Sequence, residues 1–144
     1  MGTILTIAAA ATLASCAHDG TTMTTGATSP PTLAGTQWTI ASLNGAAPAA
    51  QRKAEIRFSE DRISGNAGCN SFGGGYAVAD NVMTATRLVS TKMACPEPGM
   101  AQESAVFEIL AQPVTMTWQS DGSLMLNGDA GTMTLTPDSS PSSP

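Results

Sequence analysis

The stretch that decides the fold is AEIRFSEDRISGNAGC, which occupies residues 54–69. Residues 54–59 alternate apolar and polar side chains, which is typical of a β-strand that buries one face. The polar pair Glu60-Asp61 interrupts the alternation, and residues 62–69 follow as a second extended segment. Two such segments around a short polar break predict a β-hairpin.

Short alternating segments separated by turn residues flank this hairpin on both sides. Residues 35–43 end at Asn44-Gly45, a pair that favours a tight turn with positive φ. The breaks in the C-terminal part are residues 120–122 and 128–131, both of which contain glycine and aspartate. Together the segments amount to about eight strands. The further segments lie at residues 76–78, 82–84, 87–91, 114–119, 123–127 and 132–136.

One segment, residues 98–112, has helical spacing instead. It begins with a proline, which suits the first turn of a helix, and stops before Pro113. At 100° per residue, Glu103 falls in the middle of the apolar sector, so its carboxylate faces the core or its rim, where an unpaired charge would be costly. We expect this sector to pack on the sheet, through Met100, Val106, Phe107 and Leu110.

The composition fits a single β-rich domain. A chain of 144 residues with 42% hydrophobic and 12% charged residues can bury one core and leaves no room for a second, enzymatic domain. Aromatic residues make up only 4%, which suits short strands with many turns. Acidic residues outnumber basic ones by 11 to 6, and the net charge of -5 argues against nucleic acid as a partner. The expectation is therefore a β-rich domain.

The first sixteen residues resemble the start of a bacterial lipoprotein. Residues 4–13 form an apolar stretch that suits a signal peptide but is too short to cross the ~30 Å of bilayer hydrocarbon as a helix. Small residues then lead directly to Cys16, as in a lipobox. We expect residues 1–15 to be removed as a signal peptide and Cys16 to carry a diacylglycerol. Two or three acyl chains, at about 0.8 kcal/mol per buried methylene, hold a protein firmly on a membrane.

The alternative is an ordinary signal peptide with a chance cysteine near its end. No Lys or Arg precedes Arg52, so the basic segment that opens a signal peptide is missing. We therefore expect the natural start to lie upstream, or the chain to have been trimmed. Ala17 follows the cysteine where an aspartate would mark retention, which resembles an outer-membrane address in Gram-negative bacteria. The expected location is the cell envelope, with the domain lipid-anchored and facing the periplasm.

The segments around the domain have different compositions. Residues 16–32 are rich in Thr and Pro and nearly free of large apolar side chains, so they cannot offset the entropy cost of ordering. They predict a flexible tether with a typical end-to-end distance of ~20–25 Å. Residues 33–137 form the expected domain, and the Ser/Pro-rich residues 138–144 are expected to be a disordered tail.

Cys69 and Cys95 remain once Cys16 is assigned to lipid. An even pair of cysteines in an oxidising compartment predicts a disulfide. Closing the loop between them is worth about 3.6 kcal/mol in the chain-entropy model. The alternative is a soft site for Cu(I), because Met93 and Met100 could add thioethers to two thiolates.

Several motifs follow one another along the domain. They are the opening GTQW (35–38) and LNG (43–45), then GNAGCNSFGGGY (65–76), STKMACPEP (90–98) and Gln102-Glu103. Together they resemble the META domain of heat-inducible HslJ-type lipoproteins, over about residues 33–137 and with three separated motifs in the same order. The resemblance implies a compact α+β domain in which an antiparallel sheet curls around one helix, in envelope proteins linked to the heat response. No catalytic residues come with it.

The motif residues also have structural interpretations of their own. Gly65 and Gly68 can supply positive φ, a bulge or close backbone approach, and the glycine run lacks the Lys and Ser/Thr of a phosphate loop. Asn70 is expected to bond local backbone. Glu103 is expected to accept hydrogen bonds from this backbone or to pair with Lys92, and a catalytic role is less favoured because no second carboxylate or histidine is placed to assist it.

These observations favour a non-enzymatic envelope lipoprotein that acts as an interaction or structural module. The one histidine, His18, lies in the tether, so a Ser-His-Asp set cannot form in the domain, and no cofactor, metal or catalytic residue is expected. The partners are the membrane, through the lipid, and an unidentified protein. One alternative is a binder of a lipid or small hydrophobic ligand in a pocket between sheet and helix. A minor alternative is a thiol redox or copper-buffering role.

Overall fold

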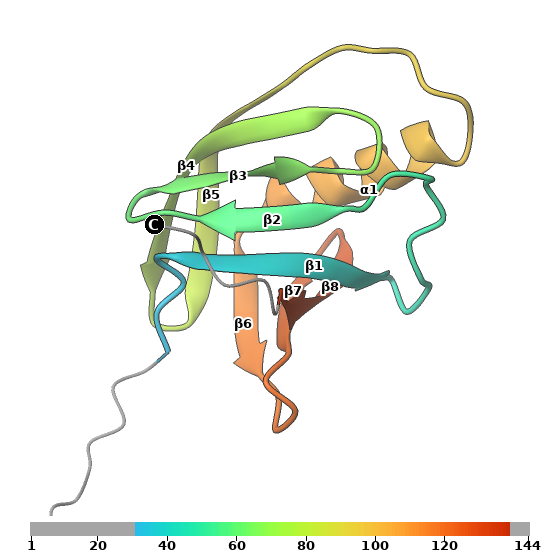
Figure 1. Cartoon of the computed structure of the whole chain (residues 1–144). Coiled ribbons are helices and arrows are strands. Elements are labelled where there is room, and N and C mark those ends of the chain that lie inside the picture. The colour runs from blue at the N-terminus through green and yellow to red at the C-terminus, as the bar shows by residue number, and fades with distance from the viewer. Residues whose placement is uncertain (1–30, 139–144) are drawn as a thin grey trace, which may run out of the picture. The chain divides into compact units, whose positions relative to one another are not determined.

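The computed structural model describes residues 31–138, which form a set of strands and a single helix (Figure 1). Within these residues no helix is long and apolar enough to cross a membrane. The predicted signal peptide, Cys16, the tether and most of the predicted tail lie outside the described residues. In chain order the elements are β1 (Thr36–Leu43), β2 (Glu55–Phe58), β3 (Arg62–Asn66), β4 (Ser71–Ala79), β5 (Val82–Ser90), α1 (Gly99–Leu110), β6 (Val114–Trp118), β7 (Leu124–Gly128) and β8 (Gly131–Pro137).

The strands close into an antiparallel barrel, which is more specific than the expected curled sheet. Each strand pairs with its neighbours in sequence, and closure comes from β1, which pairs with β8 as well as with β2. The pairing of β5 with β6 is short, with Val82 opposite Thr115 and Met83 opposite Val114. The helix lies in the connection between these two strands, and Figure 1 shows it beside the barrel. The α+β class with one helix and about eight strands is therefore confirmed.

The core fills the barrel because the strands alternate buried and exposed side chains. Each large side chain buried in this way stabilises the fold by about 1.5–3 kcal/mol. Val106, Ile109 and Leu110 of α1 are each 0% exposed and close the space between helix and strands. The fully buried strand side chains include Ile56, Ile63, Met83, Leu124, Leu126, Met133 and Leu135.

The predicted strand boundaries were wrong around the glycine run. Residues 73–75, which carry no side-chain pattern, lie inside β4, and the segments predicted at 82–84 and 87–91 belong to one strand, β5. Between Gly73 and Gly75 the register of these strands shifts, because β5 holds one extra residue there. Arg87 lies in this bulge with φ 52°, which breaks the alternation that the prediction relied on. The strand predicted at 62–69 ends at Asn66, because residues 67–70 turn back toward β4.

The helix is rotated relative to the predicted orientation. Met100 and Phe107 are only partly buried, although the ring of Phe107 still contacts Phe72 edge-on at 5.7 Å between centroids. Val106 and Leu110 are buried and Glu103 faces inward, as predicted, and Gln102 faces inward as well, because both polar side chains find hydrogen-bond partners in the turn between β3 and β4. The buried residues of α1 are Gly99, Gln102, Glu103, Val106, Ile109 and Leu110.

Candidate functional site

The candidate site is the turn of residues 67–70, where the chain passes from β3 to β4 beside α1. Ala67 donates its backbone N–H to the carbonyl of Asn70 at 3.0 Å, which closes the turn. Gly68 has φ 110°, a conformation that L side chains rarely adopt, and its N–H is bonded by the side-chain oxygen of Asn66 at 2.8 Å. The turn therefore presents its backbone to the helix in a fixed geometry. We call this turn, with Gln102, Glu103 and the Cys69–Cys95 bond described below, the brace.

Asn70 and Glu103 form the buried centre of the brace. Glu103 is 6% exposed, and its Oε2 accepts hydrogen bonds from the backbone N–H of Asn70 at 3.0 Å and from its Nδ2 at 2.9 Å. The Oδ1 of Asn70 accepts from the hydroxyl of Thr91 and from the backbone N–H of Met93, both at 2.8 Å. Of the two partners considered for Glu103, the structure has the turn, whereas Lys92 takes no part in the ion pairs among residues 31–138.

Gln102 is a second buried contact, to which the sequence analysis assigned no role. Its Nε2 donates to the carbonyl of Ala67 at 2.8 Å, and its Oε1 accepts from the backbone N–H of Ala50 at 3.0 Å. A Cβ on Gly68 would lie 2.2 Å from this Nε2, so the glycine also makes room for the amide. The polar side chain of Gln102 on the inner face of a helix could have indicated a buried hydrogen bond. Its two partners could not be inferred, because they lie far away in the sequence.

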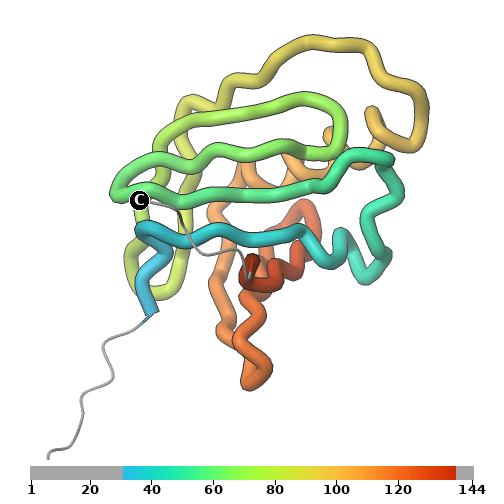
Figure 2. Tube along the Cα trace, viewed as in Figure 1, coloured from blue at the N-terminus to red at the C-terminus, as the bar shows by residue number. Residues whose placement is uncertain are grey.

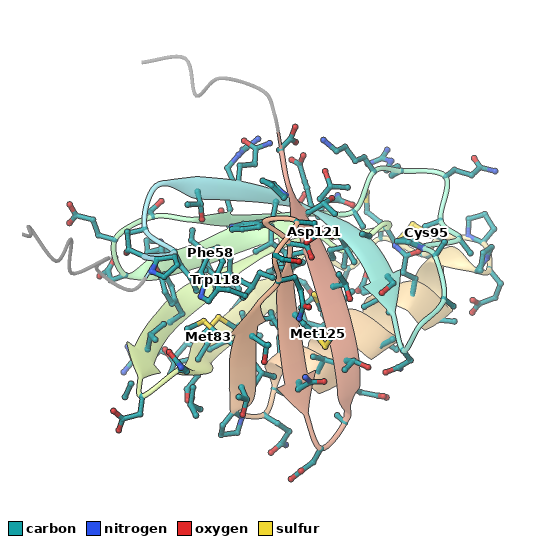
Figure 3. All side chains as sticks on the ribbon, turned by 90° about the horizontal axis from the view of Figure 1, so that it is seen from below. Phe58, Met83, Cys95, Trp118, Asp121 and Met125 are labelled. Atoms are coloured by element: carbon teal, nitrogen blue, oxygen red, sulfur yellow. A yellow bond between two sulfur atoms is a disulfide. The ribbon has the colours of Figure 1, made fainter. Side chains whose placement is uncertain are left out.

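Cys69 and Cys95 form a disulfide with 6.0 Å between their Cα atoms, so the predicted bond is confirmed. It ties the turn to residues 91–98, the connection from β5 to α1 that arches over the domain (Figure 2). Figure 3 shows Cys95 near the helix, apart from Phe58 and Met83. The bond uses both thiolates that the alternative Cu(I) site required, and Met93 is 49% exposed to solvent.

A small cleft of about 170 Å³ opens beside the brace. Its charged groups are Arg52 and Glu97, and the Oε2 of Glu97 accepts the backbone N–H of Ala101 at 3.0 Å, in the first turn of the helix. Among residues 31–138 every buried side-chain nitrogen and oxygen has a hydrogen-bond partner. The polar groups at this site therefore hold the turn, the helix and the 91–98 connection together.

The glycine at position 65, in β3, offers a test of how closely β2 and β3 pack. A Cβ at Gly65 would lie 2.0 Å from the backbone carbonyl oxygen of Glu55, so β2 would have to move. We expect Gly65→Ala to lower the free energy of unfolding by about 1–3 kcal/mol, measured by urea denaturation. Gly73→Ala is the matched control, because its Cβ would approach nothing closer than 3.7 Å. Equal stability of the two variants would contradict the close approach of β2 and β3.

The comparisons with known proteins agree with this architecture. A family model described as META domain matches residues 31–140. An NMR structure of a protein from Burkholderia xenovorans is similar, with a TM-score of 0.62 and 25% identity over 75% of this chain and 85% of that chain. A second NMR structure has a TM-score of 0.60 and 26% identity over 69% of this chain and 86% of that chain. No functionally curated protein matches the chain.

Proposed function

Because this chain belongs to the META domain family, we propose that it is a non-enzymatic interaction or structural module of the cell envelope, anchored by a lipid on Cys16. The observation that carries the proposal is the use of the buried polar groups. Glu103 and Asn70 bond each other, and Gln102 bonds the backbone of Ala50 and Ala67, as expected of a structural brace. A catalytic carboxylate would need a free face toward a substrate.

The disulfide supports the proposed location. Disulfides form and persist in the periplasm and outside the cell, and are rare in the reducing cytosol. A bond between Cys69 and Cys95 therefore fits a chain that is exported. It also leaves Cys16 as the third and unmatched cysteine of the sequence, which is available for acylation. The resemblance to heat-inducible lipoproteins supports a role in the envelope under heat or other stress.

The packing under the helix disfavours the alternative of a hydrophobic ligand between sheet and helix. The side chains of Val106, Ile109 and Leu110 are 0% exposed there and contact the strand side chains of the core. A lipid tail would have to displace them, at the cost of their burial. We therefore expect the module to bind its partners on its surface and not in a pocket between sheet and helix.

Replacing Cys16 tests the anchor. We expect the wild-type chain, expressed with a complete export signal, to fractionate with membranes and to carry acyl chains on Cys16 by mass spectrometry. Cys16→Ala should move nearly all of the protein to the soluble fraction, because the membrane affinity comes from the acyl chains. Cys69→Ala with Cys95→Ala is the matched control and should remain membrane-bound. An unmodified Cys16 thiol in the mature wild-type protein would contradict the proposal.

A further inference from the structure

A shallow groove of about 420 Å³ lies on the outer face of β3, β4 and β5. It shares no lining residue with the cleft beside the brace. Its floor is the backbone of Gly73 and Gly75, which pair with Ser64 and Arg62 of β3 on one side. The groove exists because β4 carries glycines where neighbouring strands carry side chains.

Gly73 is not needed by the fold. A Cβ there would meet only Ile63 O at 3.7 Å and Ser64 Cβ at 4.0 Å, which are ordinary contacts. Gly74, by contrast, faces inward and would bring a Cβ to 2.7 Å from the carbonyl oxygen of Thr86. A glycine in the middle of a strand marks a bulge, a tight bend or a place where a ligand approaches the backbone closely. The bulge here adds its extra residue to β5, and a Cβ would fit at Gly73, so the bulge does not require this glycine.

Two arginines flank this floor. Arg62 lies on β3 and Arg87 on β5, so β4 separates them and their backbones are about 10 Å apart, or two strand spacings. Both are exposed, and among residues 31–138 neither takes part in the ion pairs, which involve Lys53 and Arg57. In a chain with a net charge of -5, two unpaired guanidinium groups at one groove favour an anionic ligand.

The backbone conformation of Arg87 supports a binding role for its side chain. Its φ of 52° lies in the left-handed region, where glycine is favoured and an arginine is strained. A glycine at this bulge would remove the strain and the guanidinium together. The presence of arginine at a position that suits glycine indicates that the guanidinium contributes something other than stability.

The other residues that line the groove indicate which class of anionic ligand it binds. Asp61 and Thr86 can accept hydrogen bonds, and Val89, which is 70% exposed, adds an apolar edge. The side chains of an acidic peptide bring no hydroxyl donors to Asp61, whereas the hydroxyl groups of a sugar would donate hydrogen bonds to it.

We infer that this groove binds an acidic saccharide, a glycan whose carboxylates pair with Arg62 and Arg87 and whose hydroxyls bond Asp61 and Thr86. Ring C–H groups would lie over the glycine floor and against Val89. The inference deepens the proposed interaction module by naming a ligand class for it. It does not depend on the lipid at Cys16, so loss of the anchor and loss of glycan binding are separate outcomes.

Isothermal titration of the purified full chain with three probes tests the inference. We expect saturable binding of a galacturonic acid tetrasaccharide, weakened by added salt. Binding of neutral chitotetraose and of tetraglutamate should each be at least tenfold weaker. Tetraglutamate binding as tight as that of the acidic sugar would overturn the glycan in favour of an acidic peptide, and equal binding of chitotetraose or no saturable binding would overturn the site.

Two variants that leave the fold intact locate the binding in the groove. Arg87→Gly should weaken binding of the tetragalacturonate at least tenfold, with an unchanged or raised melting temperature because the strain at φ 52° is relieved. Gly73→Val should block the floor with a similar loss. Lys92→Ala is the control, because it removes an exposed positive charge outside the groove and should leave the Kd unchanged. Wild-type affinity in Arg87→Gly and Gly73→Val would overturn the assignment.

Discussion

Glu103→Ala is expected to lower the free energy of unfolding by about 3–5 kcal/mol, because it leaves two buried hydrogens of Asn70 without an acceptor: its backbone N–H and one of the two on Nδ2, the other being bonded by the carbonyl of Met93. The backbone N–H and Nδ2 of Asn70 both bond the Glu103 carboxylate, and Asn70 is 1% exposed, so water cannot readily replace it. Each hydrogen bond to a charged group is worth about 1.5–3 kcal/mol, and an unsatisfied buried donor adds its desolvation penalty. Urea denaturation followed by circular dichroism measures the change.

Two further variants separate the hydrogen bonds from other effects at Glu103. Glu103→Gln keeps an acceptor oxygen and should lose only about 1–2 kcal/mol, because a neutral acceptor is weaker than a charged one. Glu108→Ala removes a carboxylate from the exposed face of the same helix and should change stability by less than about 0.5 kcal/mol. If Glu103→Ala were as mild as Glu108→Ala, the brace would contribute little to folding.

Removal of the disulfide is expected to cause the second large loss in the free energy of unfolding. The Cys69→Ser, Cys95→Ser variant should lose about 3.6 kcal/mol, because the unfolded chain regains the entropy that the closed loop had removed. The two cysteines are 26 residues apart, and the loop includes all of β4 and β5. Thermal and urea unfolding of both proteins measure the difference.

A reducing agent provides the control for this prediction. Addition of a phosphine reductant should lower the stability of the wild-type protein toward that of the double serine variant and should leave the variant unchanged. A wild-type protein whose unfolding is insensitive to complete reduction would show that the hydrogen bonds of Thr91 and Met93 to Asn70 and Ser71 hold residues 91–98 without the disulfide.

The sequence was sufficient to predict most of the secondary structure, because alternation and turn residues are local signals. Residues 54–58 and 132–136 were expected as strands and lie in strands or at their edge. The prediction was wrong at the glycine run, because the glycines at 73–75 have no side chains that could alternate between buried and exposed. Barrel closure was not predictable either, since it depends on the pairing of β1 with β8 at the opposite end of the domain.

The sequence predicted most of the residues of the brace but not their contacts with one another. Cys69, Cys95, Asn70 and Glu103 were singled out by composition and resemblance, and the structure brings them together. Gln102 received no role, because its partners Ala50 and Ala67 lie 52 and 35 residues away. The groove was missed altogether, since Arg62 and Arg87 become neighbours only through the register of β3, β4 and β5, and a bulge sets that register.

The pairing of β1 with β8 brings the two ends of the domain to the same place. Trp38 lies opposite Pro137, and the backbone N–H of Asp138 bonds the carbonyl of Gln37 at 2.9 Å. A domain whose entry and exit are adjacent can be inserted into a surface loop of another protein without forcing that loop open. The same adjacency allows circular permutation, in which a short linker joins the ends and new termini are cut at an exposed turn such as Asp121-Gly122. The domain can therefore be inserted into other chains, or permuted, without a change in how its strands pair.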